Sequence, residues 1–271
     1  MTIESFLQNL TNGISLGALY ALISIGYTMV YGILRLINFA HGDLVMLGAY
    51  FAFYGVALFL LPWWLAFPLA ILLTTLIGII IEKAAYKPLR EFPRINLFAA
   101  AVAVAFLLEN LAIVIFGGRP KAFARPAFLD QLLNIGKVSF VSYTPVIILT
   151  AIVLCTILIL IINRTKAGIA MRALSKDIET TALMGVNTNR IIMFAFMLGS
   201  SLAAAGGILW AIKFPQINPL MGVMPGLKAF IAAVLGGIGN VWGAMIGGLL
   251  LGVVEIMLVA FFPQLAGYRD A

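Results

Sequence analysis

The chain has 271 residues, of which 63% are hydrophobic and 10% are charged, with a mean hydropathy of +1.11. Soluble domains carry roughly 25% charged residues, so a chain this apolar could not cover itself with polar side chains in water. The composition excludes an ordinary soluble protein and predicts one whose solvent is lipid. The net charge of +7 does not indicate a nucleic-acid partner, because the basic residues cluster in short segments between apolar runs.

Long apolar runs recur along the whole chain. A spanning helix needs about 20 mostly apolar residues, and backbone groups in lipid must form their hydrogen bonds internally. We therefore expect an all-α polytopic transmembrane bundle in a single domain, 1–271. The run at 227–238 is short for a full crossing, so the expected number of spans is seven or eight. The expected spans are 13–34, 44–61, 64–81, 97–116, 144–162, 191–212, 227–238 and 241–262.

The distribution of Lys and Arg predicts the orientation of these spans. Basic residues gather at 82–96 and at 163–190, and the positive-inside rule places both segments in the cytoplasm. The N-terminus then lies outside, and Arg35 and His41, just after the first span, face the cytoplasm. The long 117–143 segment contains several breaks, and we expect it to be a structured external loop.

An amphipathic helix is expected at 170–185, between two spans on the cytoplasmic side. Its charged side carries Arg172, Lys176 and Glu179, with Leu183 as an apolar exception, and Gly185 is a suitable C-terminal stop. A helix of this kind can lie flat on the membrane or dock into a groove of a soluble partner. Its apolar stripe consists of Met171, Leu174, Ile178 and Ala182.

Two segments resemble a known family. The 179–185 stretch is similar to the E-A-A-x-x-x-G loop of ABC-importer permeases, with threonine at both alanine positions. The stretch from Ile37 to Tyr50 resembles the N-F-A-H-G-(acid)-x-x-M-x-G-A-Y segment of the branched-chain amino-acid permeases, a family that includes urea and short-amide permeases. The turn at 236–240 and the ending Tyr268-Arg269-Asp270 are also similar, so the resemblance covers essentially the whole chain.

The resemblance implies a permease subunit of a bacterial ABC importer for branched-chain amino acids, located in the cytoplasmic (inner) membrane. The implied partners are a homologous permease, cytoplasmic ATPase subunits and an external solute-binding protein. The chain has no phosphate-binding loop, so we expect no ATPase site and no cofactor in it, with ATP bound by the partner subunits. Family members usually continue into one more span after the Tyr-Arg-Asp segment, whereas this sequence stops at Ala271. The residues implied to couple to the ATPase are Arg172, Leu174, Ile178, Glu179 and Gly185.

Several polar residues lie in or beside the expected spans. Glu109 and Glu255 are costly in lipid, so each either lines a solute path or forms a hydrogen bond between helices. Asn38, His41 and Asp43 follow the first span, where we expect a polar turn. One histidine with one nearby acid is a poor metal site, because three or four ligands are needed, and we expect no metal. The residues of the family segment and of the possible path are Asn38, His41, Gly42, Asp43, Glu109 and Glu255.

Three alternatives remain open at this stage. Import of urea or of a short amide fits the same resemblance. An ion-coupled secondary transporter would place broken helices around a midplane site, and Glu109, Glu255 and the Gly-rich 227–247 region are compatible with that architecture. A membrane enzyme would need a catalytic group that the chain lacks, since it has a single histidine and no nucleophile motif.

Overall fold

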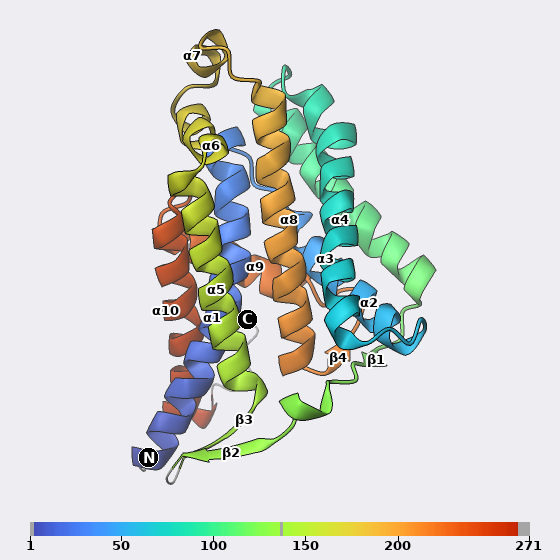
Figure 1. Ribbon diagram of the computed structural model, residues 1–271, viewed down its shortest axis with the longest axis vertical. Coiled ribbons are helices and arrows are strands. Elements are labelled where there is room, and N and C mark those ends of the chain that lie inside the picture. Colours follow the sequence, from blue (N-terminus) through green and yellow to red (C-terminus); the bar gives the residue numbers. More distant parts are fainter. Residues whose placement is uncertain (1–2, 136–137, 265–271) are drawn as a thin grey trace.

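The computed structural model describes residues 3–135 and 138–264, and it is dominated by helices that run along the long axis of the molecule (Figure 1). Among the described residues, six helices are long and apolar enough to cross a membrane. The expected number was seven or eight: the spans expected at 44–61 and 227–238 correspond to the shorter helices α2 (His41–Ala57) and α9 (Val223–Leu235), which are not among the six. The predicted all-α membrane bundle is therefore confirmed. The six long helices are α1 (Ile3–Leu34), α3 (Trp63–Ile81), α4 (Arg94–Phe116), α5 (Tyr143–Arg164), α8 (Thr188–Lys213) and α10 (Val241–Phe261).

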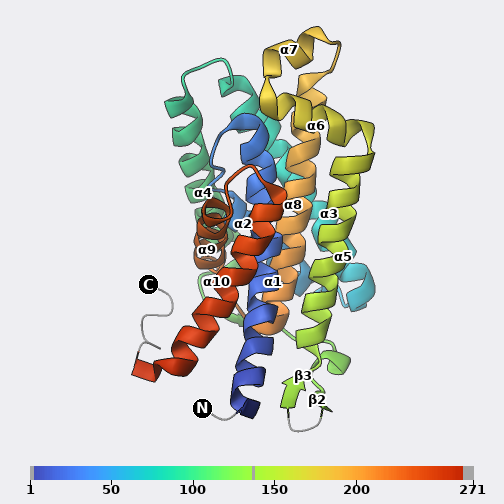
Figure 2. The same cartoon turned by 90° about the vertical axis from the view of Figure 1, so that its left-hand side faces the viewer.

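Helix α1 is the centre of the bundle. Its apolar stretch is almost wholly buried, and it packs against α5, α8, α9 and α10 (Figure 2). Its contact with α10 depends on small residues, since a Cβ on Gly17 would lie 2.7 Å from the carbonyl oxygen of Leu249, and one on Gly13 would lie 3.0 Å from the Cα of Val253. Such close approach maximises van der Waals contact between helices in lipid. The glycines spaced four apart therefore pack helices within this subunit.

The connection from α1 to α2 re-enters the bundle, which corrects the prediction that His41 faces the cytoplasm. The chain turns at Arg35, which has a φ of 50°, and α2 then begins at His41 deep among the other helices. The His41 Nε2 atom lies 3.1 Å from the carbonyl oxygen of Ile23, which is about 16 Å along α1 from its end at Leu34 at 1.5 Å per residue. The sequence alone does not reveal this re-entry, because a polar segment between two apolar runs can be either a turn at the surface or a connection buried inside the bundle.

The end of the molecule that carries the 82–96 and 163–190 segments is the predicted cytoplasmic end, and both segments lie there together (Figure 1). We expected the span that ends near residue 81 to be followed by a loop. Instead, α3 continues through the π-helix η1 (Glu82–Tyr86) and the 3-10 helix η2 (Lys87–Leu89). The connection to α4 is therefore short and largely helical.

The predicted amphipathic helix at 170–185 is two helices, so its boundaries were wrong. Helix α6 (Lys166–Lys176) ends at Asp177, whose backbone is extended, and α7 (Ile178–Leu183) begins after it. The Asp177 side chain caps α7 by accepting hydrogen bonds from the backbone N–H groups of Glu179 and Thr180. Gly185 follows with a φ of +82°, which confirms the predicted stop.

The 117–143 segment lies at the opposite end of the molecule, where it contains short strands and one helical turn (Figure 1). Strand β1 (Lys121–Ala122) pairs antiparallel with β4 (Gln216–Ile217), which ties this segment to the connection between α8 and α9. After η3 (Ala127–Leu129), strands β2 (Leu132–Ile135) and β3 (Val138–Val141) form a hairpin. The prediction of a structured loop is confirmed. The ending Tyr268-Arg269-Asp270 lies outside the described residues.

Candidate functional site

A cavity of about 150 Å³ lies inside the bundle, between α1, the re-entrant connection, α2, α4 and α9. The segment that resembles the family supplies one wall, through Phe39, Gly42 and Asp43. Helix α4 supplies Glu109, and α1 supplies Tyr27. The remaining wall is the apolar side of α9. Two of the path residues expected from the sequence, Asp43 and Glu109, are therefore brought together across one cavity.

The floor of the cavity requires glycine because α2 and α9 meet there backbone to backbone. A Cβ on Gly42 would lie 2.6 Å from the carbonyl oxygen of Gly222, and one on Gly226 would lie 2.8 Å from the Cα of Gly42. Real Cβ atoms do not approach other heavy atoms this closely, so any larger residue would force the two short helices apart. The close approach fixes the position of Asp43 in the first turn of α2 relative to α9.

The other polar residues of this segment hold the re-entrant connection in place. The Tyr86 hydroxyl donates a hydrogen bond of 2.6 Å to the Asn38 Oδ1 atom, which joins the connection to η1. The His41 ring packs against Tyr27, with ring centroids 4.4 Å apart, and contacts the Ile23 carbonyl. Buried polar groups need such partners in a low-dielectric interior. Asn38 and His41 thus position the wall that carries Asp43.

Glu255 does not line this cavity but joins three helices. Its Oε1 atom lies 3.2 Å from the Lys228 Nζ atom on α9, and its Oε2 atom accepts a hydrogen bond of 2.9 Å from the Tyr20 hydroxyl on α1. Of the two sequence-based readings, hydrogen bonding between helices describes Glu255. Sequence reasoning missed Lys228, although a lone lysine in an apolar helix was a signal that Glu255 needed a cation.

The helix α7 and the residue that follows it expose apolar side chains at the end of the molecule that was predicted to be cytoplasmic. Ile178, Leu183 and Met184 are 41%, 88% and 80% exposed, and α7 projects beyond the rest of the bundle (Figure 1). Leu174 is 1% exposed and packs into the core, so it fastens α6 to the bundle and is not available to a partner. The predicted stripe thus divides at Asp177 into a buried part on α6 and an exposed part on α7.

The cap of α7 has an electrostatic component. Hydrogen bonds from the Thr180 hydroxyl and from the backbone amides of Thr180 and Glu179 lower the pKa of the Asp177 carboxyl below its ordinary value. The charged carboxylate also lies at the N-terminus of α7, where the helix dipole favours a negative charge. Asp177 is therefore ionised at physiological pH, and it caps the start of α7 through hydrogen bonds with α7 residues alone.

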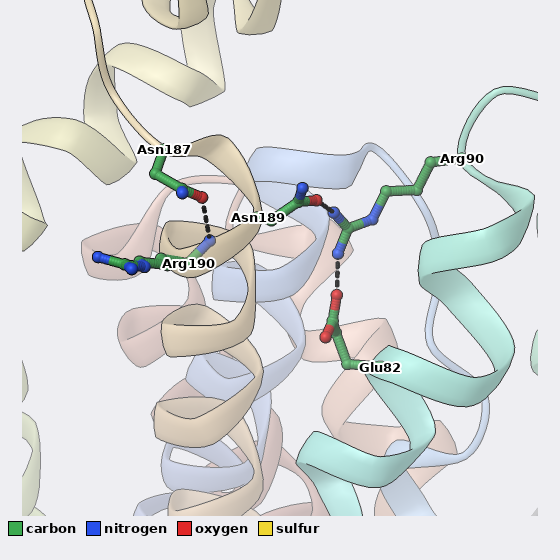
Figure 3. A network of polar contacts seen from close by, with 5 residues as sticks. All are labelled: Glu82, Arg90, Asn187, Asn189 and Arg190. Carbon is green, nitrogen blue, oxygen red and sulfur yellow. Dashed lines mark hydrogen bonds and ion pairs between the residues drawn. The ribbon is translucent and has the colours of Figure 1, made fainter.

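A polar network connects α8 to α3 close to this region (Figure 3). Arg90 forms an ion pair with Glu82, whose side chain is almost fully buried, and donates a hydrogen bond of 2.8 Å to the Asn189 Oδ1 atom. Asn187 caps the start of α8 by accepting from the Arg190 N–H group. The network links the first turn of α8, which follows α7 and Gly185, to the C-terminal end of α3.

A bundle of spanning helices, a partly polar internal cavity and an exposed helix at one end define a polytopic membrane transport protein. The sequence profile of the family described as "Branched-chain amino acid transport system / permease component" matches residues 9–270. The chain therefore belongs to this family of permease components and is a multi-pass protein of the cytoplasmic membrane.

Curated relatives match over nearly the whole chain. The high-affinity branched-chain amino acid transport system permease protein BraD of Pseudomonas aeruginosa is 41% identical over 99% of this chain and 90% of its own length. The permease protein LivH of Escherichia coli K12 is 38% identical over 98% of this chain and 89% of its own length. The ribose import permease protein RbsC of Haemophilus influenzae is 27% identical over 92% of this chain and 76% of its own length. No solved structure matches this chain with statistical significance.

Proposed function

We propose that the chain is the permease subunit of an ATP-driven importer that carries branched-chain amino acids across the cytoplasmic membrane. The observation that carries this proposal is the near-complete match to branched-chain amino acid permeases at 38–41% identity. The more distant similarity to a ribose permease, at 27% identity, favours an amino acid over other solutes. Neither urea import nor ion-coupled transport is favoured by these relatives.

The exposed apolar side chains of α7 support an ATPase partner at the cytoplasmic end. Large apolar side chains that project into water as a group are typical of a protein–protein contact. We expect Ile178, Leu183 and Met184 to enter a cleft of the ATPase subunit, with Glu179 and Gly185 beside them. Helix α6, fastened by Leu174 and by the Arg172–Asn163 hydrogen bond of 2.8 Å, would hold α7 in position.

The network around Arg90 would carry movement of α7 into the bundle. Helix α7 is followed within a few residues by α8, and Arg90 joins the start of α8 to α3.

A solute-binding protein would dock at the opposite end, onto the 117–143 segment with its β2–β3 hairpin. A homologous permease would complete the path, and the chain itself would hydrolyse no ATP.

Paired substitutions at the exposed end of α7 test the ATPase contact. We expect Leu183→Asp with Met184→Asp to abolish co-purification of the ATPase subunits with the permease, because two charges would be desolvated in an apolar cleft. Leu132→Asp is the matched control, since Leu132 is a similarly exposed leucine on β2 at the other end of the molecule. Undiminished co-purification of the ATPase with the α7 variant would contradict the proposed contact.

A further inference from the structure

Helix α4 lies at the edge of the bundle and is fastened to it near its two ends (Figures 1 and 2). Near its start, Phe98 packs edge-on against Phe39 of the re-entrant connection, with ring centroids 5.5 Å apart. At its end, Phe116 stacks on Tyr50 of α2, with ring centroids 4.4 Å apart. Between these two contacts, α4 forms one wall of the cavity described above.

Asn110 lies on the side of α4 that faces away from this subunit. Leu108 packs against the hydrophobic core, and at about 100° per residue Asn110 points roughly 200° away from it. Leu107 and Val114 share this outer side and are 56% and 80% exposed. The outer side of α4 therefore carries one amide side chain among large apolar ones.

The Asn110 amide is only partly satisfied within its own helix. Its Nδ2 atom donates a hydrogen bond of 2.7 Å to the carbonyl oxygen of Phe106. An amide oxygen also accepts hydrogen bonds, and in the part of the chain that the structure describes no donor reaches the Oδ1 atom of Asn110. Thr156, an exposed polar residue on α5, differs because its hydroxyl donates a hydrogen bond of 2.7 Å to the Ile152 carbonyl of the same helix.

Glu109, the neighbour of Asn110, lacks a basic partner in the cavity that it lines. It lies about 10 Å along α4 from the end at Phe116, at 1.5 Å per residue, and so within the depth of the hydrocarbon. No Lys, Arg or His is among the described residues that line the cavity, and the ionisable group nearest in effect is another acid, Asp43. A carboxyl group in a membrane span faces protein or a water-filled path in either protonation state.

We infer that the outer side of α4 around Asn110 is the surface that packs against the homologous permease, and that the translocation path runs beside Glu109 at this contact. Lipid tails offer no hydrogen-bond donor, whereas asparagine side chains form hydrogen bonds between packed helices in membranes. This inference rests on the proposed function, which requires a homologous permease, and adds the face that the partner covers.

The chemistry of the partner follows from the groups on this face. The homologous permease presents a helix with apolar side chains against Leu107 and Val114 and a hydrogen-bond donor opposite the Oδ1 atom of Asn110. Two subunits of one fold that insert in the same orientation pair through the same face of each. The cavities of the two subunits therefore lie on either side of one contact.

Photo-crosslinking in the complete importer tests the position of this contact. The crosslinker p-benzoylphenylalanine is placed at Leu107 or Val114 on α4, with Leu149 and Ile157 on α5 as matched controls that are 63% and 48% exposed. We expect an adduct with the homologous permease from both α4 positions and none from α5. Mass spectrometry identifies each adduct.

Three outcomes would overturn the inference while leaving the proposed function intact. They are no permease adduct from α4 in an importer that takes up leucine, equal adducts from α4 and α5, and adducts only between two copies of this chain. A wild-type complex that imports no branched-chain amino acid, yet gives the α4 adducts, would instead overturn the proposed function.

A second test measures the contribution of Asn110 to pairing. We expect Asn110→Leu to weaken association of the two permeases in lipid vesicles about three- to ten-fold, measured by fluorescence energy transfer, because a hydrogen bond between helices is lost. Thr156→Val is the control and should leave association unchanged. Leucine is more favourable than asparagine in a lipid-facing helix, so association that is unchanged or stronger in Asn110→Leu would show that this side of α4 faces lipid.

Discussion

Charged side chains inside this bundle differ in what they contact, and the difference separates structural residues from those of the candidate path. Glu255 has Lys228 and Tyr20 as partners, and Glu82 has Arg90. Asp43 and Glu109 have each other across a cavity. Buried charges that are paired hold helices together, whereas acidic residues that line a cavity are candidates for a functional site.

Removal of Lys228 should destabilise the bundle. We expect Lys228→Met to cost about 3–5 kcal/mol of unfolding free energy, because it takes away the cation beside a buried carboxylate. The double variant Lys228→Met with Glu255→Met should recover most of that loss, since an apolar pair of similar volume is often neutral. Thermal unfolding of the permease in nanodiscs measures both, and equal destabilisation in the single and double variants would contradict a pairing role.

At the scale of helices, two features of the sequence predicted the fold well and two did not. Apolar runs located the spans, and the clusters of Lys and Arg marked two segments, 82–96 and 163–190, that lie together at one end of the molecule. The re-entry of the chain before His41 was missed because polarity at 35–43 is compatible with either a surface turn or a buried polar segment. The break at Asp177 was missed because the helical spacing of apolar residues continues across it. The Asp177 side chain nevertheless caps a new helix, α7, at this position.

The glycines of α1 should differ in how they tolerate a methyl group. Gly17→Ala would place a Cβ against the backbone of Leu249, so we expect a loss of about 1–3 kcal/mol from overpacking. Gly32→Ala is the control in the same helix, because its Cβ would meet Gly239 at 3.6 Å, an ordinary contact. Equal unfolding temperatures of the two variants in detergent would contradict the tight contact between α1 and α10 at Gly17.

Helix α7 should depend on its cap. Asp177→Ala removes the acceptor for the Glu179 and Thr180 amides, so we expect weaker binding of the purified ATPase subunit, whereas Asp177→Asn keeps the acceptor and should bind nearly as wild type. Surface plasmon resonance would measure both affinities. Equal affinity for the Ala and wild-type forms would show that α7 needs no cap.

The pH dependence of this cap follows from the lowered pKa of Asp177. A carboxyl group whose pKa is lower in the folded state than in the unfolded state stabilises the folded state at any pH above its unfolded-state pKa. That stabilisation is lost as the pH falls through the folded-state pKa. Between pH 5 and pH 8 the Asp177 carboxylate stays ionised. We therefore expect ATPase affinity to show no titration from this residue in that window.

At the scale of the whole molecule, the chain combines long apolar helices, a cavity between them and an exposed α7 that projects at one end (Figures 1 and 2). The sequence alone predicted the membrane bundle, the common end of its two basic segments and the family, since these depend on composition and on local segments. It predicted Asp43 and Glu109 as path candidates, yet their meeting across one cavity depends on the packing of α2 against α4. Contacts between residues so far apart in sequence have no local signal.

The most direct test of a permease driven by a separate ATPase is leucine uptake into proteoliposomes under two energy sources. We expect uptake by the complete importer when ATP is supplied to the ATPase side together with loaded binding protein, and none from this chain with its permease partner under an ion gradient alone. Full-rate leucine uptake under the ion gradient, with no ATPase present, would contradict the account.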